Sequence, residues 1–171
     1  MLGRTSLLVL GVLALAVVAL AGCGGSTSHA LPTTSDGRPA TVGVASTGLG
    51  DVLVDRQGRT LYLFARDSGA KSSCTAGCAV NWPPLLVQGS PLLGSGATPS
   101  EVGKTARADG QSQITYNGHP LYRFVNDKKP GDTNGEGISA FGGSWFAVSP
   151  VGAKVAPRSQ PQGGGGYGGG Y

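Results

Sequence analysis

Hydrophobic and polar residues alternate with a period of two through the middle of the chain, which is the pattern of half-buried β-strands. An apolar run at 52–54, a short polar turn and a second apolar run at 60–64 predict a β-hairpin. A second hairpin is predicted at 114–124, where Asn117 and Gly118 favour the positive φ angles of a two-residue turn. Further strands are expected at 41–46, 104–108 and 145–149.

Helical periodicity is weak throughout this central region. At most a short helical turn is expected, near 99–102 or around the cysteines at 74 and 78. The composition agrees, because 31 glycines and 11 prolines in 171 residues argue against a helical bundle or a coiled coil. The fold class is therefore predicted to be all-β.

An internal duplication is the strongest signal in the chain. Five residues recur 60 positions further on, namely Gly58, Leu61, Tyr62, Phe64 and Asp67, which become Gly118, Leu121, Tyr122, Phe124 and Asp127. Trp82 and Trp145 correspond at a spacing of 63. A unit of hairpin, acidic loop and Trp-containing strand is thus used twice, at about 50–88 and 111–150.

The two antiparallel hairpin units are expected to pack pseudo-symmetrically into one compact domain at 41–155, flanked by disordered tails. The Tyr and Phe of each copy are two positions apart, so they share one face of a strand. We therefore expect the repeated aromatic residues in the core, namely Tyr62, Phe64, Trp82, Tyr122, Phe124 and Trp145.

The repeated motif also carries a family resemblance. Residues 62–67 and 122–127 both match the pattern Tyr-x-(Phe/Trp/Tyr)-x-x-Asp. The chain resembles a family of predicted bacterial lipoproteins that carry this motif, also called secreted repeats of unknown function. Other segments similar to the family's recurrent ones are 74–79, 82–84 and 131–135. The resemblance covers about 50–150 and implies export and a duplicated fold, and it brings no assigned catalytic residues.

The N-terminal segment has the features of a lipoprotein signal peptide. Arg4 precedes an unbroken apolar run at 7–20, which is too short to span a bilayer comfortably as a helix. The tetrapeptide Leu-Ala-Gly-Cys at 20–23 resembles the bacterial lipobox, with a plain secretory signal and a chance cysteine as the alternative. We expect residues 1–22 to be removed and Cys23 to carry the lipid that anchors the protein at the extracytoplasmic face of the cell membrane.

Low-complexity segments flank the predicted domain. Residues 23–40 are rich in Gly, Ser, Thr and Pro, and are predicted to form a flexible tether. Residues 156–171 are dominated by Gly and Tyr, and are predicted to be disordered because they lack the apolar area to offset backbone entropy.

The repeated aspartates, Asp67 and Asp127, admit two interpretations. In the first, each carboxylate accepts backbone N–H groups and shapes the turn that follows its strand. In the second, the two form a paired carboxylate site related by pseudo-symmetry, as in a hydrolase. The first interpretation is favoured, because nothing in the sequence brings the two carboxylates together.

Cys74 and Cys78 are predicted to form a structural disulfide. Their CxxxC spacing is neither the redox CxxC nor the haem-attachment CxxCH, and an exported chain folds where disulfides persist. A straight strand would hold the two residues about 13 Å apart, beyond disulfide reach, so the segment must curl. The bridge is expected to hold the loop that carries Trp82 into the core.

Charge and motif content exclude several functions. The formal net charge is +4, but the basic residues are scattered, so no nucleic-acid partner is predicted. No Gly-x-Ser-x-Gly elbow, phosphate loop or dinucleotide fingerprint occurs. The loop at 132–138 lacks the twelfth-position Glu of a calcium loop, so a Gly-rich turn is favoured there. No catalytic residue, resident metal or cofactor is predicted.

These observations favour a non-catalytic binding or structural module with an unknown ligand. Its expected partners are the membrane, through the lipid on Cys23, and an envelope protein or cell-wall component. The alternative is a metal or redox-cofactor carrier that uses Asp67, Asp127, His119 or neighbouring tyrosines. A hydrolase that uses Asp67 and Asp127 ranks third.

Overall fold

The computed structural model describes residues 31–32 and 41–155. The predicted signal peptide at 1–22, the predicted lipidation site Cys23 and the C-terminal segment 156–171 lie outside the described residues, as does nearly all of the predicted tether at 23–40. The strands are β1 (Gly43–Thr47), β2 (Gly50–Val54), β3 (Tyr62–Phe64), β4 (Val102–Ala106), β5 (Ser112–Tyr116), β6 (His119–Pro120), β7 (Ser139–Ala140) and β8 (Gly143–Ala147). Helix α1 (Gly77–Asn81) and the 3₁₀ turn η1 (Pro99–Glu101) lie where short helical turns were expected.

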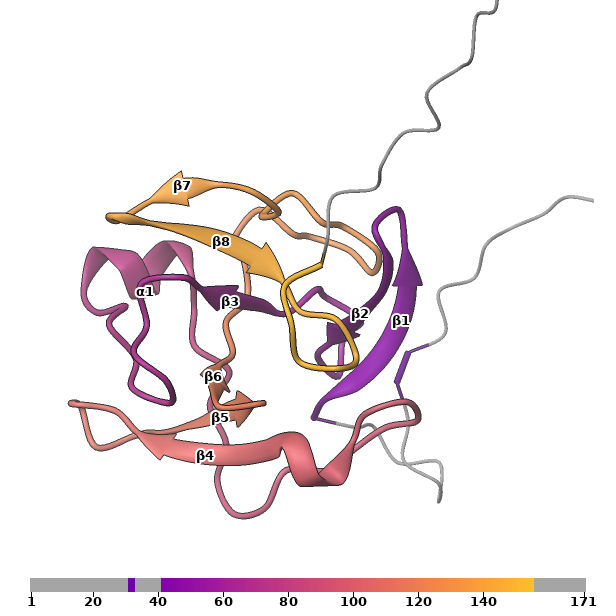
Figure 1. The fold of residues 1–171 in the computed structure, drawn as a ribbon, viewed down its shortest axis with the longest axis horizontal. Helices are drawn as coiled ribbons and strands as arrows, with labels where there is room; N and C mark the ends of the chain where they lie inside the picture. Colours follow the sequence, from indigo (N-terminus) through magenta and orange to yellow (C-terminus); the bar gives the residue numbers. More distant parts are fainter. Residues whose placement is uncertain (1–30, 33–40, 156–171) are drawn as a thin grey trace, which may run out of the picture.

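The strands form three small antiparallel sheets, with the orders β1-β2, β3-β8-β7 and β4-β5-β6. In Figure 1 the β3-β8-β7 and β4-β5-β6 sheets lie above and below the centre of the molecule, and the β1–β2 hairpin and α1 lie at opposite ends. The predicted all-β fold class is confirmed, with one short helix added.

The two predicted hairpins differ in outcome. The second is present, since β5 pairs with β6 across Asn117 (φ 47°) and Gly118 (φ 74°), a turn that needs two positive φ angles. In the first, the turn forms and Val54 bridges Thr60, but β2 then pairs with β1 and β3 with β8. The expected ladder between 52–54 and 60–64 is therefore wrong beyond this bridge, because β3 takes a partner from the other repeat.

The two repeats are interlocked. Tyr62 and Tyr122 exchange both backbone hydrogen bonds, N to O, at 2.8 and 2.9 Å. Phe64 of β3 lies opposite Trp145 of β8. In the other half, the segment after Tyr122 pairs in the same way with the segment around Trp82, through N–H groups that donate to main-chain oxygens at 2.9 and 3.0 Å. The Trp-containing segment of each repeat thus pairs with the motif segment of the other, so the units are not self-contained. The expected Trp-containing strand is present only in the second repeat, as β8, because Trp82 caps the C-terminus of α1 instead.

Both faces of the central strands are buried, which follows from apolar residues at successive positions. One core cluster contains the aromatic motif residues and the disulfide, with Val52, Val54, Tyr62, Phe64, Cys74, Cys78, Trp82, Tyr122, Trp145 and Ala147. The other is mostly aliphatic, with Val42, Leu53, Leu61, Leu63, Leu85, Ile114, Tyr116, Leu121 and Val148. Phe124 packs partly buried against the first cluster.

Candidate functional site

Four aromatic rings form a continuous stack through the centre of the molecule. The order is Phe64, Trp145, Trp82 and Phe124, with centroid separations of 4.1, 3.9 and 4.3 Å. The outer phenylalanine in each case stacks on the tryptophan of the other repeat. The two tryptophan planes are within 2° of parallel, and this close contact joins the two halves of the core.

The motif tyrosines pack edge-on against the same stack. The Tyr62 ring meets Trp82 at 5.4 Å and 79°, and the Tyr122 ring meets Trp145 at 5.1 Å and 89°. Both arrangements are the T-shaped geometry that aromatic quadrupoles favour. The structure therefore brings all six repeated aromatic residues together in one cluster.

Each motif tyrosine also contacts the acidic loop of the other repeat through its hydroxyl group. The hydroxyl of Tyr62 donates to Asp127 Oδ2 at 2.6 Å, and the hydroxyl of Tyr122 donates to Asp67 Oδ2 at 2.7 Å. Each aspartate thus accepts a hydrogen bond from the tyrosine of the other repeat. None of the hydrogen bonds among the described residues joins one donor to both carboxylates, so the structure gives them two separate networks.

Asp127 lies in the more buried of the two networks, with 3% of the residue exposed. Its Oδ1 accepts the backbone N–H of Asn134 at 3.0 Å and the side-chain amide of Asn134 at 3.1 Å. Burial raises the pKa of the Asp127 carboxyl, and the hydrogen bonds from Tyr62 and Asn134 oppose that shift.

The Tyr62 hydroxyl is held by the backbone of the Gly-rich loop. The N–H of Gly135 donates to this hydroxyl at 3.2 Å. A Cβ at Gly135 would lie 2.8 Å from Cζ of Tyr62 and 2.9 Å from Cη2 of Trp82, so only glycine fits here without displacement. Burial, together with the Asp127 carboxylate, raises the pKa of Tyr62, which stays protonated as a donor.

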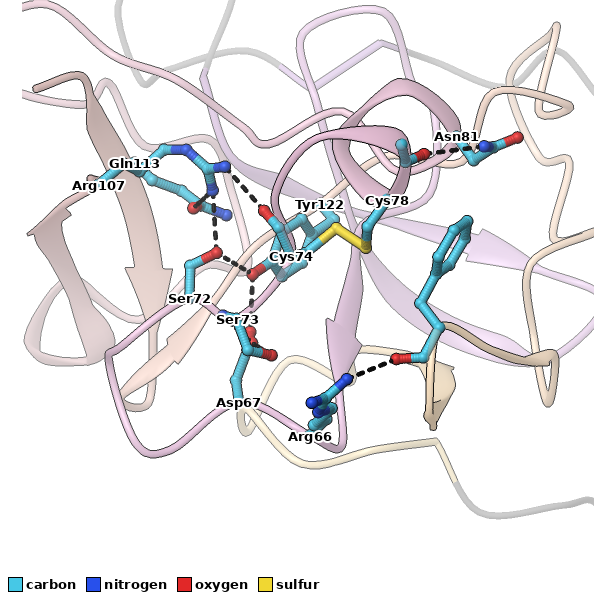
Figure 2. Close-up of a disulfide and its surroundings, with 12 residues drawn as sticks. Arg66, Asp67, Ser72, Ser73, Cys74, Cys78, Asn81, Arg107, Gln113 and Tyr122 are labelled. Carbon is cyan, nitrogen blue, oxygen red and sulfur yellow. Dashed lines mark hydrogen bonds between the residues drawn. A yellow bond between two sulfur atoms is a disulfide. The ribbon is translucent and has the colours of Figure 1, made fainter. Parts of the chain in front are cut away.

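Asp67 has a matching arrangement in the disulfide loop, shown in Figure 2. Its Oδ1 accepts the backbone N–H of Ser73 at 2.7 Å and the Ser73 hydroxyl at 2.9 Å. The Tyr122 hydroxyl lies 2.7 Å from Oγ of Ser72. Because the phenol proton goes to Asp67, Ser72 acts as the donor in this contact. Burial is the main cause of the raised pKa of Tyr122, and the Asp67 charge adds to it.

A buried guanidinium supports this second network. Arg107 donates from Nη1 to Ser72 Oγ at 2.9 Å and to Gln113 Oε1 at 2.6 Å, and from Nη2 to the Cys74 carbonyl at 2.8 Å. A polar chain therefore runs from a cation, through two hydroxyl groups, to the Asp67 carboxylate (Figure 2). Opposite charges at its two ends fix the direction of its hydrogen bonds.

The structure contains the predicted disulfide between Cys74 and Cys78, whose Cα atoms are 5.2 Å apart. The segment curls because Ala76 takes a left-handed φ of 47° and α1 begins immediately after it. The backbone N–H of Trp82 then bonds to the Cys78 carbonyl at 2.8 Å. The bridged loop thus delivers Trp82 to the ring stack, as the sequence analysis expected.

The remaining candidates occupy structural positions. His119 lies in β6 opposite Tyr116. In the loop at 132–138, Asp132 Oδ2 accepts the backbone N–H groups of Lys128 and Lys129, and Glu136 Oε2 accepts that of Ala147. Within the described ranges, no three His, Cys, Asp or Glu side chains are grouped so that they could hold a metal ion.

Sequence reasoning missed Arg107 and Ser72, which gave no recognisable signal because they belong to no repeated motif. It also passed over Arg123, although a signal was present: Arg123 occupies the motif position that holds Leu63 in the first copy.

Comparison with protein families explains the repeat. The profile of a lipoprotein family described as a secreted repeat of unknown function matches residues 43–86 and 103–149, just over half of the chain. The chain belongs to this family. The two matches correspond to the two copies of the secreted repeat, and they begin at β1 and immediately after the first residue of β4, respectively.

No curated protein and no solved structure matches the chain significantly. Membership in the secreted repeat family assigns no catalytic residue to the protein, since the function of the family is unknown. In the part of the chain that the structure describes, no helix is long and apolar enough to cross a membrane.

Proposed function

We propose that this secreted repeat protein is a non-catalytic binding or structural module, held at the extracytoplasmic face of the cell membrane by a lipid on Cys23. The family description as a secreted repeat, within a lipoprotein family, supports export. The lipobox-like tetrapeptide at 20–23 supports the anchor. Residues 23–40 would serve as the tether between the anchor and the folded domain.

One observation carries the non-catalytic assignment: both motif carboxylates are occupied by protein donors. Each accepts a tyrosine hydroxyl on Oδ2, and a backbone N–H together with a side-chain donor on Oδ1. A general acid, a general base or a nucleophile has to reach substrate with its reacting oxygen. Asp67 and Asp127 instead use their oxygens to bind the two repeats to each other.

Carboxyl footprinting of the native protein tests this assignment. A water-soluble carbodiimide with an amine nucleophile should modify Asp109, whose side chain is 52% exposed, and leave Asp127 and Asp67 much slower to react. Unfolding in denaturant should remove the difference. Fast modification of Asp67 and Asp127 in the folded protein would contradict the assignment.

Elemental and optical analysis of the protein purified from cells tests whether the protein carries a metal or a redox cofactor. We expect neither stoichiometric metal nor a haem absorbance band. A metal or chromophore that is lost in Asp67→Asn or His119→Ala, while the fold is retained, would show a cofactor carrier instead.

Anchoring is tested at Cys23. The wild-type protein should partition into the detergent phase, and Cys23→Ala should abolish this partition. The double variant Cys74→Ala/Cys78→Ala is the matched control, and should still partition like wild type. An unmodified N-terminus downstream of residue 23 in an intact mass measurement would refute lipidation.

A further inference from the structure

The pseudo-symmetry of the two repeats breaks at one position of the motif. Leu63 in the first copy is 6% exposed and lies in the aliphatic core cluster. Its counterpart in the second copy is Arg123, whose backbone N–H keeps the equivalent hydrogen bond, to the carbonyl of Pro83 at 2.9 Å. The backbone is therefore conserved between the copies, while a core side chain is replaced by a half-buried guanidinium.

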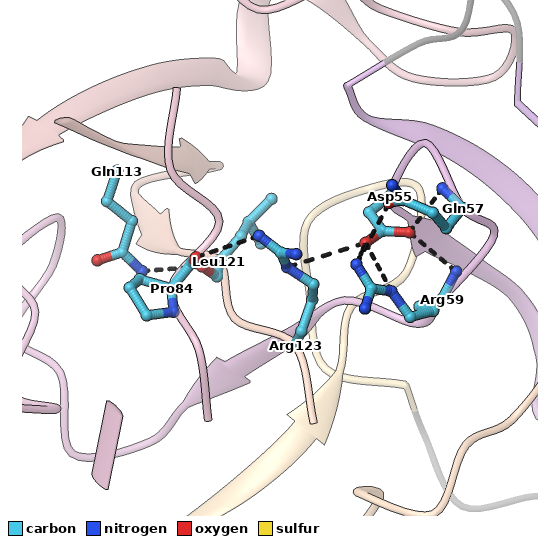
Figure 3. Close-up of polar contacts among 7 residues, drawn as sticks. All are labelled: Asp55, Gln57, Arg59, Pro84, Gln113, Leu121 and Arg123. Atoms are coloured by element: carbon cyan, nitrogen blue, oxygen red, sulfur yellow. Dashed lines mark hydrogen bonds and ion pairs between the residues drawn. The ribbon is translucent and has the colours of Figure 1, made fainter. Parts of the chain in front are cut away.

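Arg123 is incompletely paired. Its Nε lies 3.8 Å from Asp55 Oδ2, and its Nη2 makes one long hydrogen bond, 3.4 Å, to the Pro84 carbonyl (Figure 3). Among the described residues, the buried Nε has no hydrogen-bond partner. A guanidinium has five N–H donors, and within the part of the chain that the structure describes Arg123 uses one of them, on Nη2, in a hydrogen bond.

Asp55 does not neutralise Arg123, because another arginine already holds its carboxylate. Arg59 donates to Asp55 Oδ2 from Nε at 3.0 Å and from Nη2 at 2.7 Å, so two N–H groups of one guanidinium converge on a single carboxylate oxygen (Figure 3). The backbone N–H groups of Gln57 and Arg59 occupy Oδ1. Burial lowers the pKa of Arg123, Asp55 opposes this, and the charges of Arg59 and Arg56 lower it further. Asp55 is thus hydrogen-bonded to the Arg59 side chain, and the charges of Arg59 and Arg56 act on Arg123.

Asp55, Arg56 and Arg123 line a small pocket that adjoins a larger groove. The pocket has a volume of about 100 Å³ and is lined by Thr41, Asp55, Arg56, Gln57, Leu85, Leu86 and Arg123. It shares Thr41, Arg56 and Leu86 with a groove of about 850 Å³ that continues along residues 87–90 and 110–112. The pocket holds roughly three water volumes, enough for one carboxylate or phosphate group. The groove is of the size that binds small ligands.

We propose that the Arg56–Arg123 pocket binds a carboxylate or phosphate group, and that the rest of an elongated ligand lies along the adjoining groove. The positive charge supplies the recognition, since a guanidinium pairs with either anion through two parallel N–H bonds. This inference rests on the proposed function as a binding module, and names the chemistry of its ligand. The pseudo-symmetric position, with Leu63, lacks the cation and is not expected to bind an anion.

The test is an NMR titration of the full chain, purified in detergent, with inorganic phosphate and separately with tetraglutamate. At least one probe should shift the amide signals of residues 55–57 and 123, which line the pocket. If tetraglutamate binds, it should also shift those of residues 87–90 and 110–112, because it is long enough to extend into the groove. Arg56→Gln and Arg123→Leu should each weaken that binding at least tenfold. Lys128→Gln, which removes an exposed cation elsewhere, is the matched control and should bind like wild type. The stronger probe identifies the phosphate or the carboxylate source.

Arg56 is exposed, so its variant keeps the test decisive even if Arg123→Leu fails to fold. Two outcomes would overturn the inference: no shift with either probe at millimolar concentration, or equal weakening in Lys128→Gln, which would indicate non-specific charge attraction. Neither outcome would refute the anchored, non-catalytic module, which carboxyl footprinting and detergent partition test independently.

Discussion

The Tyr122–Asp67 pair and the Tyr62–Asp127 pair occupy equivalent positions in the two repeats and are stabilised by different loops. In both, one residue of the acidic loop gives Oδ1 a backbone N–H and a side-chain donor: Ser73 for Asp67 and Asn134 for Asp127. The loops differ at the tyrosine hydroxyl. Tyr122 meets the Ser72 side chain, whereas Tyr62 meets a backbone N–H.

The rest of each loop diverges further. The Asp67 loop is closed by the Cys74–Cys78 bridge and braced by the buried side chain of Arg107. The Asp127 loop has no bridge, and it approaches the Tyr62 ring through a glycine that leaves no room for a side chain. The comparison shows that the motif specifies the contact between repeats, and that each loop supplies its supporting donors in its own way.

Truncating either motif tyrosine should have the largest effect. Tyr62→Ala and Tyr122→Ala are each expected to lower the free energy of unfolding by roughly 3 kcal/mol or more, the range for large core truncations. Because the repeats are interlocked, each variant should still unfold in a single transition. Denaturant titration followed by tryptophan fluorescence measures both properties, since the only two tryptophans are in the stack. A biphasic transition would indicate that the repeats fold independently.

Removing the disulfide should destabilise the Asp67 loop and leave the Asp127 loop largely unchanged. Cys74→Ser/Cys78→Ser is expected to cost about 2 kcal/mol, because the bridge closes a very short loop. Hydrogen exchange should accelerate at the Ser73 amide, which bonds to Asp67, and should change little at the Asn134 amide. Equal acceleration at both amides would show that the bridge supports the whole core rather than one loop.

Alkaline pH should weaken both networks together. The pKa values of Tyr62 and Tyr122 are raised by burial, so the folded state keeps these phenols protonated while the unfolded chain ionises. Their contribution is complete below the ordinary tyrosine pKa near 10, and it is lost as pH rises above that value. Each tyrosine should lower the free energy of unfolding by about 1.4 kcal/mol per pH unit there. Denaturation midpoints from pH 8 to 11 should fall less steeply in Tyr62→Phe and Tyr122→Phe.

The smallest expected effect is the loss of the side-chain hydrogen bond to Oδ1 of Asp67 or of Asp127. Ser73→Ala and Asn134→Ala each remove one side-chain donor and keep the backbone N–H. Asn134→Ala is expected to cost about 1 kcal/mol and Ser73→Ala less, because Asp127 is more deeply buried than Asp67. Chemical denaturation of the two variants gives the order, and the reverse order would mean that burial does not govern the strength of these bonds.

Much of the core was predictable because its signal is local or repeated. Alternation located β2, β3, β5 and β8, and the spacing of 60 identified Tyr62 and Tyr122 as equivalent. The exchange between repeats was not predictable. Two identical motifs do not indicate whether a tyrosine bonds to the aspartate of its own copy or of the other, and β3 pairs with β8 far along the chain.

The polar contacts of Arg107 and the pocket around Arg123 could not be predicted from the sequence, for a related reason. Arg107 lies just beyond β4, but its partners include Ser72 and Cys74, which only the tertiary fold brings near. Arg123 was visible as a charged residue in place of Leu63, and its pocket appears only once Asp55 and Arg56 are placed beside it. Long-range pairing, rather than propensity, decided these features.

Double-mutant cycles on the four tyrosine–aspartate combinations test the reciprocal exchange most directly. The cycles pair Tyr→Phe with Asp→Ala, and the coupling energy is measured from chemical denaturation. The pairs between repeats, Tyr62 with Asp127 and Tyr122 with Asp67, should couple by about 1–3 kcal/mol. The pairs within a repeat, Tyr62 with Asp67 and Tyr122 with Asp127, should couple by less than about 0.5 kcal/mol. Strong coupling within repeats and none between them would contradict the interlocked core.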